Sequence, residues 1–182
     1  SYNRRNFIKT SSLGAIAASS LSINCQNNLS IPNEGVYMGD FADEPIKKIR
    51  AAFIGLNRGG SHLRNFATIE NTEVVALSDL YEENIKRELE RLYQYNSNTN
   101  NVKTYWGDKN KWKVMLKEVR PDVVFISTNW NNHAPMAIQS MIDGAHAFVE
   151  VPMAITLEEM WDIVNTSEKT QKYCMMMENV NY

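Results

Sequence analysis

A glycine-rich turn between two apolar segments is the feature that most restricts the fold of this chain. The apolar residues 51–54 run into the sequence GLNRGG at positions 55–60, and a second apolar segment ends at Asp79. A glycine turn that opens a helix exposes backbone N–H groups at the positive end of the helix dipole, where a pyrophosphate can bind. Asp79 follows Gly55 at about the spacing of the acidic residue that binds an adenosine ribose. Residues 50–79 therefore predict a dinucleotide-binding site.

The turn departs from the usual dinucleotide fingerprint at one position. In the pattern G-x-G-x-x-G the glycines would fall at 55, 57 and 60, but residue 57 is Asn. The second glycine lets the backbone approach the phosphates, so we expect a shifted turn in which Gly59 supplies the close approach. The alternative is an ordinary glycine loop beside a strand. The apolar strand before the turn and Asp79 after it favour the cofactor site.

The composition is that of a soluble globular protein with one full core. The chain has 182 residues, of which 43% are hydrophobic and 22% charged. A net charge of −2 argues against a nucleic-acid partner or an anionic membrane surface. The two cysteines, Cys25 and Cys174, offer no disulfide framework to the domain, because Cys25 lies in the leader described next.

The first 25 residues predict an export signal. Consecutive Arg4 and Arg5 are followed by Phe7 and Lys9, and then by a mild apolar stretch at residues 13–23. This order resembles a twin-arginine signal, which exports folded proteins, and it predicts a periplasmic protein that captures its cofactor before export. The alternative is a basic amphipathic start to a first helix.

Two features follow the predicted signal. Cys25 stands where a lipid-attachment cysteine could stand, but residues 22–24 match the lipoprotein pattern poorly, so a lipid-anchored form is the less favoured alternative. Residues 26–46 contain Asn, Ser, Pro and Gly without periodicity and predict a tether ahead of a domain at residues 47–182.

Hydrophobic periodicity predicts alternating helices and strands after Asp79. Helices are expected at residues 82–93, around 112–119, at 135–143 with Gly144 as cap, and after a capping box at Thr156 and Glu159. Strands are expected at residues 102–106, 123–126, 147–149 and 173–177. The helix stripes expected to be buried include Ile85, Leu89, Leu92 and Tyr93, and later Met160, Ile163 and Val164. Right-handed crossovers then give a doubly wound parallel sheet, an α/β Rossmann-like fold.

Polar residues follow three of the predicted strands. They are residues 127–133 after the strand at 123–126, which include Trp130, Asn131, Asn132 and His133; Glu150 after the strand at 147–149; and residues 178–182 after the last strand, which include Asn179 and Tyr182. Ligands of this fold bind at the carboxyl ends of the strands, so we expect these residues to line one crevice. Taken singly, His133 could cap a helix, Trp130 could be a core aromatic, and Glu150 could be a solvated turn residue.

These motifs, in this order and spacing, resemble the N-terminal cofactor domain of the Gfo/Idh/MocA superfamily. Most members are sugar or inositol oxidoreductases that carry Glu-Lys-Pro where this chain has Glu150-Val151-Pro152. The lysine acts as a catalytic acid/base in those enzymes, whereas Val151 can neither donate nor accept a proton.

The Glu-Val-Pro sequence, the leader, Trp-x-x-His and Met-Glu-Asn-x-x-Tyr together resemble glycoside hydrolase family 109, over about residues 47–182. This resemblance implies an NAD-dependent α-N-acetylgalactosaminidase in which NAD is recycled. In the implied mechanism the sugar C3 hydroxyl is transiently oxidised, the C2 proton becomes acidic, the aglycone is eliminated, water adds, and C3 is reduced again. Such enzymes are exceptions to two-carboxylate glycoside hydrolysis.

The resemblance also implies residue roles. Asn57 and Arg58 contact the pyrophosphate region, and Asp79 contacts the adenosine ribose and favours NAD over NADP. Trp130, Asn131, Asn132, His133, Glu150, Val151 and Asn179 line the ribose and nicotinamide half, and Tyr182 borders the substrate pocket. The catalytic Tyr and His are expected beyond residue 182, in a second α/β domain that forms the sugar pocket and usually the oligomer contacts. No metal is expected.

We therefore interpret the chain as the cofactor-binding part of a larger enzyme, able to bind NAD but not to catalyse by itself. Its expected partner is a small-molecule carbohydrate, with homo-oligomer contacts made through the second domain. Two alternatives stay open: an NAD(P)-dependent sugar oxidoreductase of the same superfamily, and a non-catalytic NAD-binding module.

Overall fold

The computed structural model of the chain describes residues 37–94 and 101–178. The predicted export signal, residues 26–36 of the predicted tether, Asn179 and Tyr182 lie outside the described residues. All described residues belong to one compact unit.

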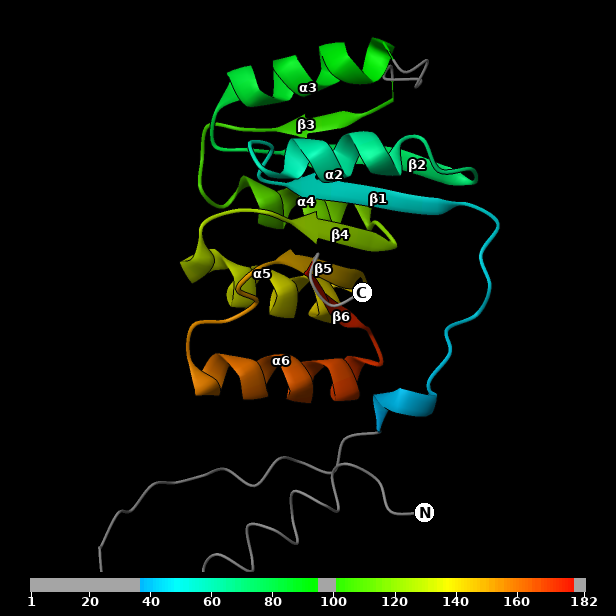
Figure 1. Ribbon diagram of the computed structural model, residues 1–182, viewed down its shortest axis with the longest axis vertical. Helices are drawn as coiled ribbons and strands as arrows, with labels where there is room; N and C mark the ends of the chain where they lie inside the picture. Colours follow the sequence, from blue (N-terminus) through cyan, green and yellow to red (C-terminus); the bar gives the residue numbers. More distant parts are fainter. Residues whose placement is uncertain (1–36, 95–100, 179–182) are drawn as a thin grey trace, which may run out of the picture. The chain divides into compact units, whose positions relative to one another are not determined.

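A six-stranded parallel sheet forms the centre of the domain (Figure 1). Its strands are β1 (Ile49–Ile54), β2 (Thr72–Ser78), β3 (Lys103–Tyr105), β4 (Val123–Ile126), β5 (His146–Glu150) and β6 (Cys174–Met177). They lie in the order β3-β2-β1-β4-β5-β6, with every neighbouring pair parallel. This is the doubly wound order, so the predicted fold is confirmed.

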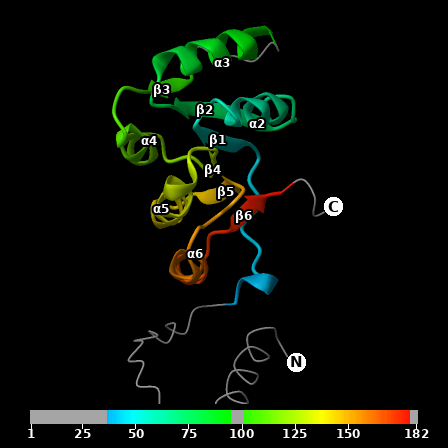
Figure 2. The same cartoon turned by 60° about the vertical axis from the view of Figure 1, so that its left-hand side comes forward.

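Helices cover both faces of the sheet, as seen when the views of Figure 1 and Figure 2 are compared. The helices are α2 (Gly59–Phe66), α3 (Glu82–Gln94), α4 (Lys111–Val119), α5 (Trp130–Ile142) and α6 (Leu157–Thr170), preceded by the short 3-10 helix η1 (Met38–Asp40). Ala51 and Phe53 of β1 pack in one core with residues of α2 and α3, and Ala52 and Ile54 pack in a second core with residues of α4, α5 and α6. Because strand side chains alternate between faces, the continuous apolar run of β1 serves both cores.

Aromatic rings connect the central strands on the α2 side of the sheet. Phe53 stacks on Phe125 of β4 with ring centroids 4.6 Å apart, and Phe125 stacks on Phe148 of β5 at 5.1 Å. Phe66 of α2 meets both Phe53 and Phe125 edge-on. These ring contacts fix the positions of β1, β4 and β5 relative to one another.

The structure corrects several details of the predicted helices. Helix α5 begins at Trp130 and contains Pro135 in its interior, whereas the sequence predicted a start at Pro135. Tyr93, predicted to be buried, is 76% exposed, while Glu88 is fully buried. The capping box of Thr156 and Glu159 is confirmed. In the stripe predicted for α6 only Ile163 is buried; Met160 and Val164 are exposed.

Residues 37–43, part of the predicted tether, are attached to the domain. Asp43 Oδ2 accepts hydrogen bonds from Lys172 Nζ at 2.7 Å and from His146 Nε2 at 2.9 Å, and the Tyr173 hydroxyl donates to the carbonyl of Phe41. The Lys172 hydrogen bond is the main cause that lowers the pKa of Asp43 to about 2. Burial lowers the pKa of His146. We call these contacts the N-terminal clasp.

The described residues contain neither of two features that would indicate a membrane or metal role. None of the helices among them combines the length and apolar character needed to cross a membrane. No group of three or more His, Cys, Asp or Glu side chains among them could hold a metal ion.

Candidate cofactor-binding site

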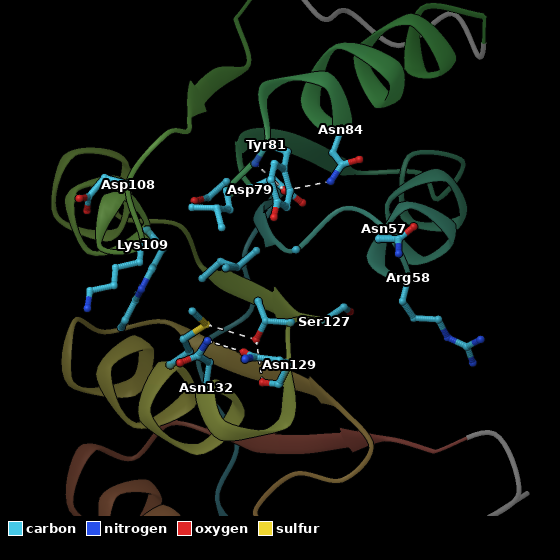
Figure 3. A pocket seen from close by; sticks show the side chains of 17 residues that line it. Asn57, Arg58, Asp79, Tyr81, Asn84, Asp108, Lys109, Ser127, Asn129 and Asn132 are labelled. Atoms are coloured by element: carbon cyan, nitrogen blue, oxygen red, sulfur yellow. Dashed lines mark hydrogen bonds between the residues drawn. The ribbon is translucent and has the colours of Figure 1, made fainter.

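A cavity of about 630 Å³ lies at the carboxyl ends of β1, β2 and β4 (Figure 3). This is the point where the strand order reverses, the usual ligand position in a doubly wound sheet. The cavity is lined by Ile54, Gly55, Asn57, Arg58, Ser78, Asp79, Leu80, Tyr81, Asn84, Asp108, Lys109, Trp112, Ser127, Thr128, Asn129, Asn132 and Met136.

Gly55 makes the sharp turn out of β1. Its φ is +84°, in the left-handed region, and a Cβ added to it would lie 2.5 Å from the carbonyl oxygen of Ser127. Both the torsion and the space therefore require glycine. Helix α2 begins four residues later at Gly59, where an added Cβ would lie 3.1 Å from the Ser127 Cβ. The turn and the start of α2 thus lie directly against the residue that follows β4.

Asp79, the residue after β2, is held by three hydrogen bonds. Its Oδ2 accepts from the backbone N–H of Leu56 at 2.7 Å. Its Oδ1 accepts from the N–H of Tyr81 and from Asn84 Nδ2, both at 3.0 Å. A carboxylate offers about four acceptor positions, so one position on Oδ2 is left for a ligand hydroxyl.

Ser127 carries a buried hydroxyl whose Oγ has no hydrogen-bond partner among the described residues. The residue is 7% exposed, and it lines the cavity next to the start of α2. A buried polar atom without a partner costs free energy, so the position favours a ligand that supplies one. No side-chain cap closes the N-terminus of α2 at Arg58 either. Both features fit a bound pyrophosphate.

The structure brings together two residues that the sequence predicted separately, Arg58 and Glu150. Glu150 Oε1 lies 2.7 Å from His62 Nε2 and 3.5 Å from Arg58 Nε. Burial raises the pKa of Glu150, but the hydrogen bond and charge of His62 and the charge of Arg58 outweigh it, so the net pKa is lowered. Figure 3 shows the Arg58 side chain directed away from Asp79 and Ser127.

The start of α5 at Trp130 explains why the four residues predicted after β4 do not share one surface. Successive helical positions turn by about 100°. Asn132 therefore lines the cavity, Trp130 and Asn131 are exposed, and His133 is buried with 1% of its surface exposed. His133 Nδ1 and Nε2 lie 2.7 Å from the Pro152 carbonyl and 3.1 Å from the Thr128 carbonyl, so this ring connects the loops after β4 and β5.

The remaining predicted residues divide into three groups. Asn57, Arg58 and Asp79 line the cavity. Val151 is 38% exposed and, like Glu150, lies beyond the cavity lining at the end of β5. Asn179 and Tyr182 lie outside the described residues.

The sequence assigned no role to several polar residues of the lining. Ser127 was expected at the crevice as one of the polar residues that follow the strand at 123–126, but it was given no role of its own. Asn84 stands on a helix where an exposed face is the ordinary expectation, and Lys109 lies in the loop between β3 and α4. Their place at the cavity follows from the packing of elements that are distant in sequence.

Comparisons with known proteins identify the family of the chain and its cofactor. The family model described as oxidoreductase family, NAD-binding Rossmann fold, matches residues 49–178. Glycosyl hydrolase family 109 protein 2 of Akkermansia muciniphila is 47% identical over 152 residues, covering 83% of this chain and 32% of that protein. Glycosyl hydrolase family 109 protein 1 of Shewanella sp. (strain MR-4) is 39% identical, covering 99% and 40%. The chain thus spans less than half the length of these relatives, which carry the name that the resemblance predicted.

Solved structures show the same fold. The WlbA dehydrogenase from Chromobacterium violaceum, in complex with NADH and UDP-GlcNAcA, is 22% identical, with a TM-score of 0.61 over 75% of this chain and 37% of that one. The scyllo-inositol dehydrogenase from Lactobacillus casei with bound NAD(H) and scyllo-inositol is 20% identical, with a TM-score of 0.61 over 72% and 36%. The chain belongs to the Gfo/Idh/MocA oxidoreductase family, and residues 49–178 are its NAD-binding Rossmann domain.

Proposed function

We propose that this chain is the cofactor domain of an NAD-dependent glycosidase of the family 109 type, acting on α-N-acetylgalactosaminides. The observation that carries the proposal is the 47% identity to a relative named glycosyl hydrolase family 109, maintained over 83% of the chain. Val151 supports it, because an alkyl side chain stands where the sugar oxidoreductases of the resemblance carry an acid/base lysine.

The residues around the cavity would hold the cofactor by distinct contacts. The free acceptor position of Asp79 binds an adenosine ribose hydroxyl, and the start of α2, with Asn57, Arg58 and the Ser127 hydroxyl, binds the pyrophosphate. Trp130, Asn131, Asn132, His133, Glu150, Val151 and Asn179 remain the predicted neighbours of the ribose and nicotinamide, and Tyr182 of the sugar. Bound NAD supplies reversible hydride acceptance, while the protein determines its position and surroundings.

His133 contributes by position. Since its ring is buried and bridges the carbonyls of Thr128 and Pro152, it keeps the loops after β4 and β5 at a fixed spacing. Glu150 is anchored by His62 and does not reach the cavity lining. Proton transfer to the substrate is therefore assigned, in this proposal, to residues of the second domain.

The proposal extends to the setting of the enzyme. Residues 1–25 are proposed to direct twin-arginine export to the periplasm, and the second domain to supply the sugar pocket and any oligomer contacts. The sugar oxidoreductase remains a second candidate because the solved structures with the same fold include dehydrogenases.

The test uses the complete gene product that contains this chain. An aryl α-N-acetylgalactosaminide is supplied without added cofactor, and the nucleotide released on denaturation is identified. The proposal is supported if the protein retains NAD and hydrolyses the substrate. It is supported further if the sugar released from a reaction in D2O carries deuterium at C2. Net NADH formation with free sugars favours the oxidoreductase instead. Retained NAD without either reaction favours a non-catalytic NAD-binding module.

A further inference from the structure

We propose that Asn84 and Arg87 of α3 are positioning residues that fix the Asp79 carboxylate and so make the cavity select NAD over NADP. The inference rests on the cavity being the NAD site and goes beyond it, because neither residue was predicted to contribute to cofactor choice.

The Asp79 carboxylate is held in one orientation by donors on both of its oxygens. The Leu56 N–H binds Oδ2, and the Tyr81 N–H and the Asn84 side chain bind Oδ1. Asn84 is the one side chain among these donors. Substitution of Asn84 therefore removes a donor without deleting any backbone group of the site.

Arg87 determines which way the Asn84 amide faces. Arg87 Nη1 donates to Asn84 Oδ1 at 2.7 Å, so the amide oxygen faces the guanidinium and the amide nitrogen faces Asp79. An amide orientation is assigned from its hydrogen-bond partners, and here a cation on one side and a carboxylate on the other agree. Figure 3 shows Asn84 on α3 above Asp79, with the hydrogen bond between them drawn.

Arg87 is itself committed to protein acceptors. Its Nη2 donates to the Leu56 carbonyl at 3.1 Å and its Nε to Glu88 Oε1 at 3.1 Å. Glu88 is fully buried and also binds Arg64 at 2.7 Å and Arg91 at 2.8 Å. This buried carboxylate anchors the guanidinium, and an added Cβ at Gly60 would lie 2.7 Å from it, so the start of α2 packs on the same group.

Selection against NADP follows from these two constraints. A 2′-phosphate adds negative charge at the ribose, where Asp79 is fixed and cannot turn aside. Arginine is the residue type that accommodates a 2′-phosphate in related folds, but every nitrogen group of Arg87 already serves Asn84, Leu56 or Glu88. The hydrogen-bonded chain of Arg87, Asn84 and Asp79 thus fixes the carboxylate in place. It also leaves the Arg87 guanidinium without a nitrogen group free to bind a phosphate.

The test measures dissociation constants for NAD and NADP by calorimetry on the purified chain. Asn84→Leu keeps a similar side-chain volume but lacks the N–H donor. It should raise the dissociation constant for NAD about tenfold and lower the NAD-over-NADP preference by a similar factor. Glu90→Ala, on an exposed position of the same helix, is the matched control and should leave both constants unchanged. If Asn84→Leu does not fold, Asn84→Ser, whose hydroxyl is too short to reach Asp79, replaces it.

A double-mutant cycle shows whether Asn84 acts through Asp79. In the Asp79→Ala background, Asn84→Leu should change the preference by less than about twofold. The proposal is overturned if Asn84→Leu leaves the NAD-over-NADP preference unchanged. It is also overturned if the effects of Asn84→Leu and Asp79→Ala on that preference are fully additive. A wild-type chain that binds neither nucleotide overturns the cofactor assignment itself, so the two failures are distinguishable.

Discussion

Replacing Gly55 by Ala in the turn after β1 should lower the free energy of unfolding for two separate reasons. The first is the positive φ of +84°, which costs an L-residue about 1–2 kcal/mol. The second is the contact with Ser127, since the new Cβ would lie 2.5 Å from its carbonyl oxygen and 2.8 Å from its carbonyl carbon. Reaching ordinary contact requires a backbone shift of roughly 0.5–1 Å, for which overpacking costs of about 1–3 kcal/mol are typical. We expect a loss of about 2–5 kcal/mol.

Gly144→Ala is the matched control for this substitution. Gly144 has a φ of +94°, but an added Cβ would meet nothing within 4 Å, so only the torsional cost of about 1–2 kcal/mol applies. Urea unfolding of both variants measures the difference, expected to be about 1–3 kcal/mol. Calorimetry with NAD should show at least about tenfold weaker binding for Gly55→Ala and no change for Gly144→Ala. Equal losses of stability, or unchanged NAD affinity in Gly55→Ala, would refute the reasoning.

Three further predictions concern the cavity, the core and the clasp. Ser127→Ala should leave the free energy of unfolding within about 0.5 kcal/mol of wild type or raise it, because an unpartnered hydroxyl is removed, while NAD titration shows weaker binding. Phe53→Ala should cost about 3–5 kcal/mol in urea unfolding, since it removes a buried ring stacked on Phe125; a loss under about 1 kcal/mol would contradict that packing. Because the folded-state pKa of His146 is lowered, stability should fall as pH drops below about 6.5, and His146→Phe should remove that slope from unfolding curves measured across pH.

The doubly wound parallel sheet could be predicted because its alternating strands and helices follow local patterns. Each buried strand is a short apolar run, and the glycine turn at residues 55–60 indicates the first crossover. The capping box at Thr156 and the cap at Gly144 were equally visible, since each depends on residues close together in sequence.

The errors arose where distant residues determine the outcome. Glu88 is buried beside Ile85 and Leu92 of the expected stripe, because arginines from α2 and α3 neutralise it, whereas Tyr93 is exposed. At α5, a helix that contains Pro135 rather than starting at it rotated His133 into the core and left Trp130 outside. Asn84 could not be found from sequence because its role depends on how α3 packs over Asp79.

The N-terminal clasp determines from which side of the sheet a fusion partner, dye or surface can be attached to the domain. Asp43 binds His146 at the start of β5 and Lys172 just before β6, so the clasp lies at the amino edge of the sheet. The cofactor cavity lies at the carboxyl edge. A fusion partner, dye or immobilising surface joined ahead of Tyr37 is therefore carried by the side of the sheet opposite the cavity mouth. Single-molecule or surface-capture experiments on nucleotide binding can use that end of the chain as the handle.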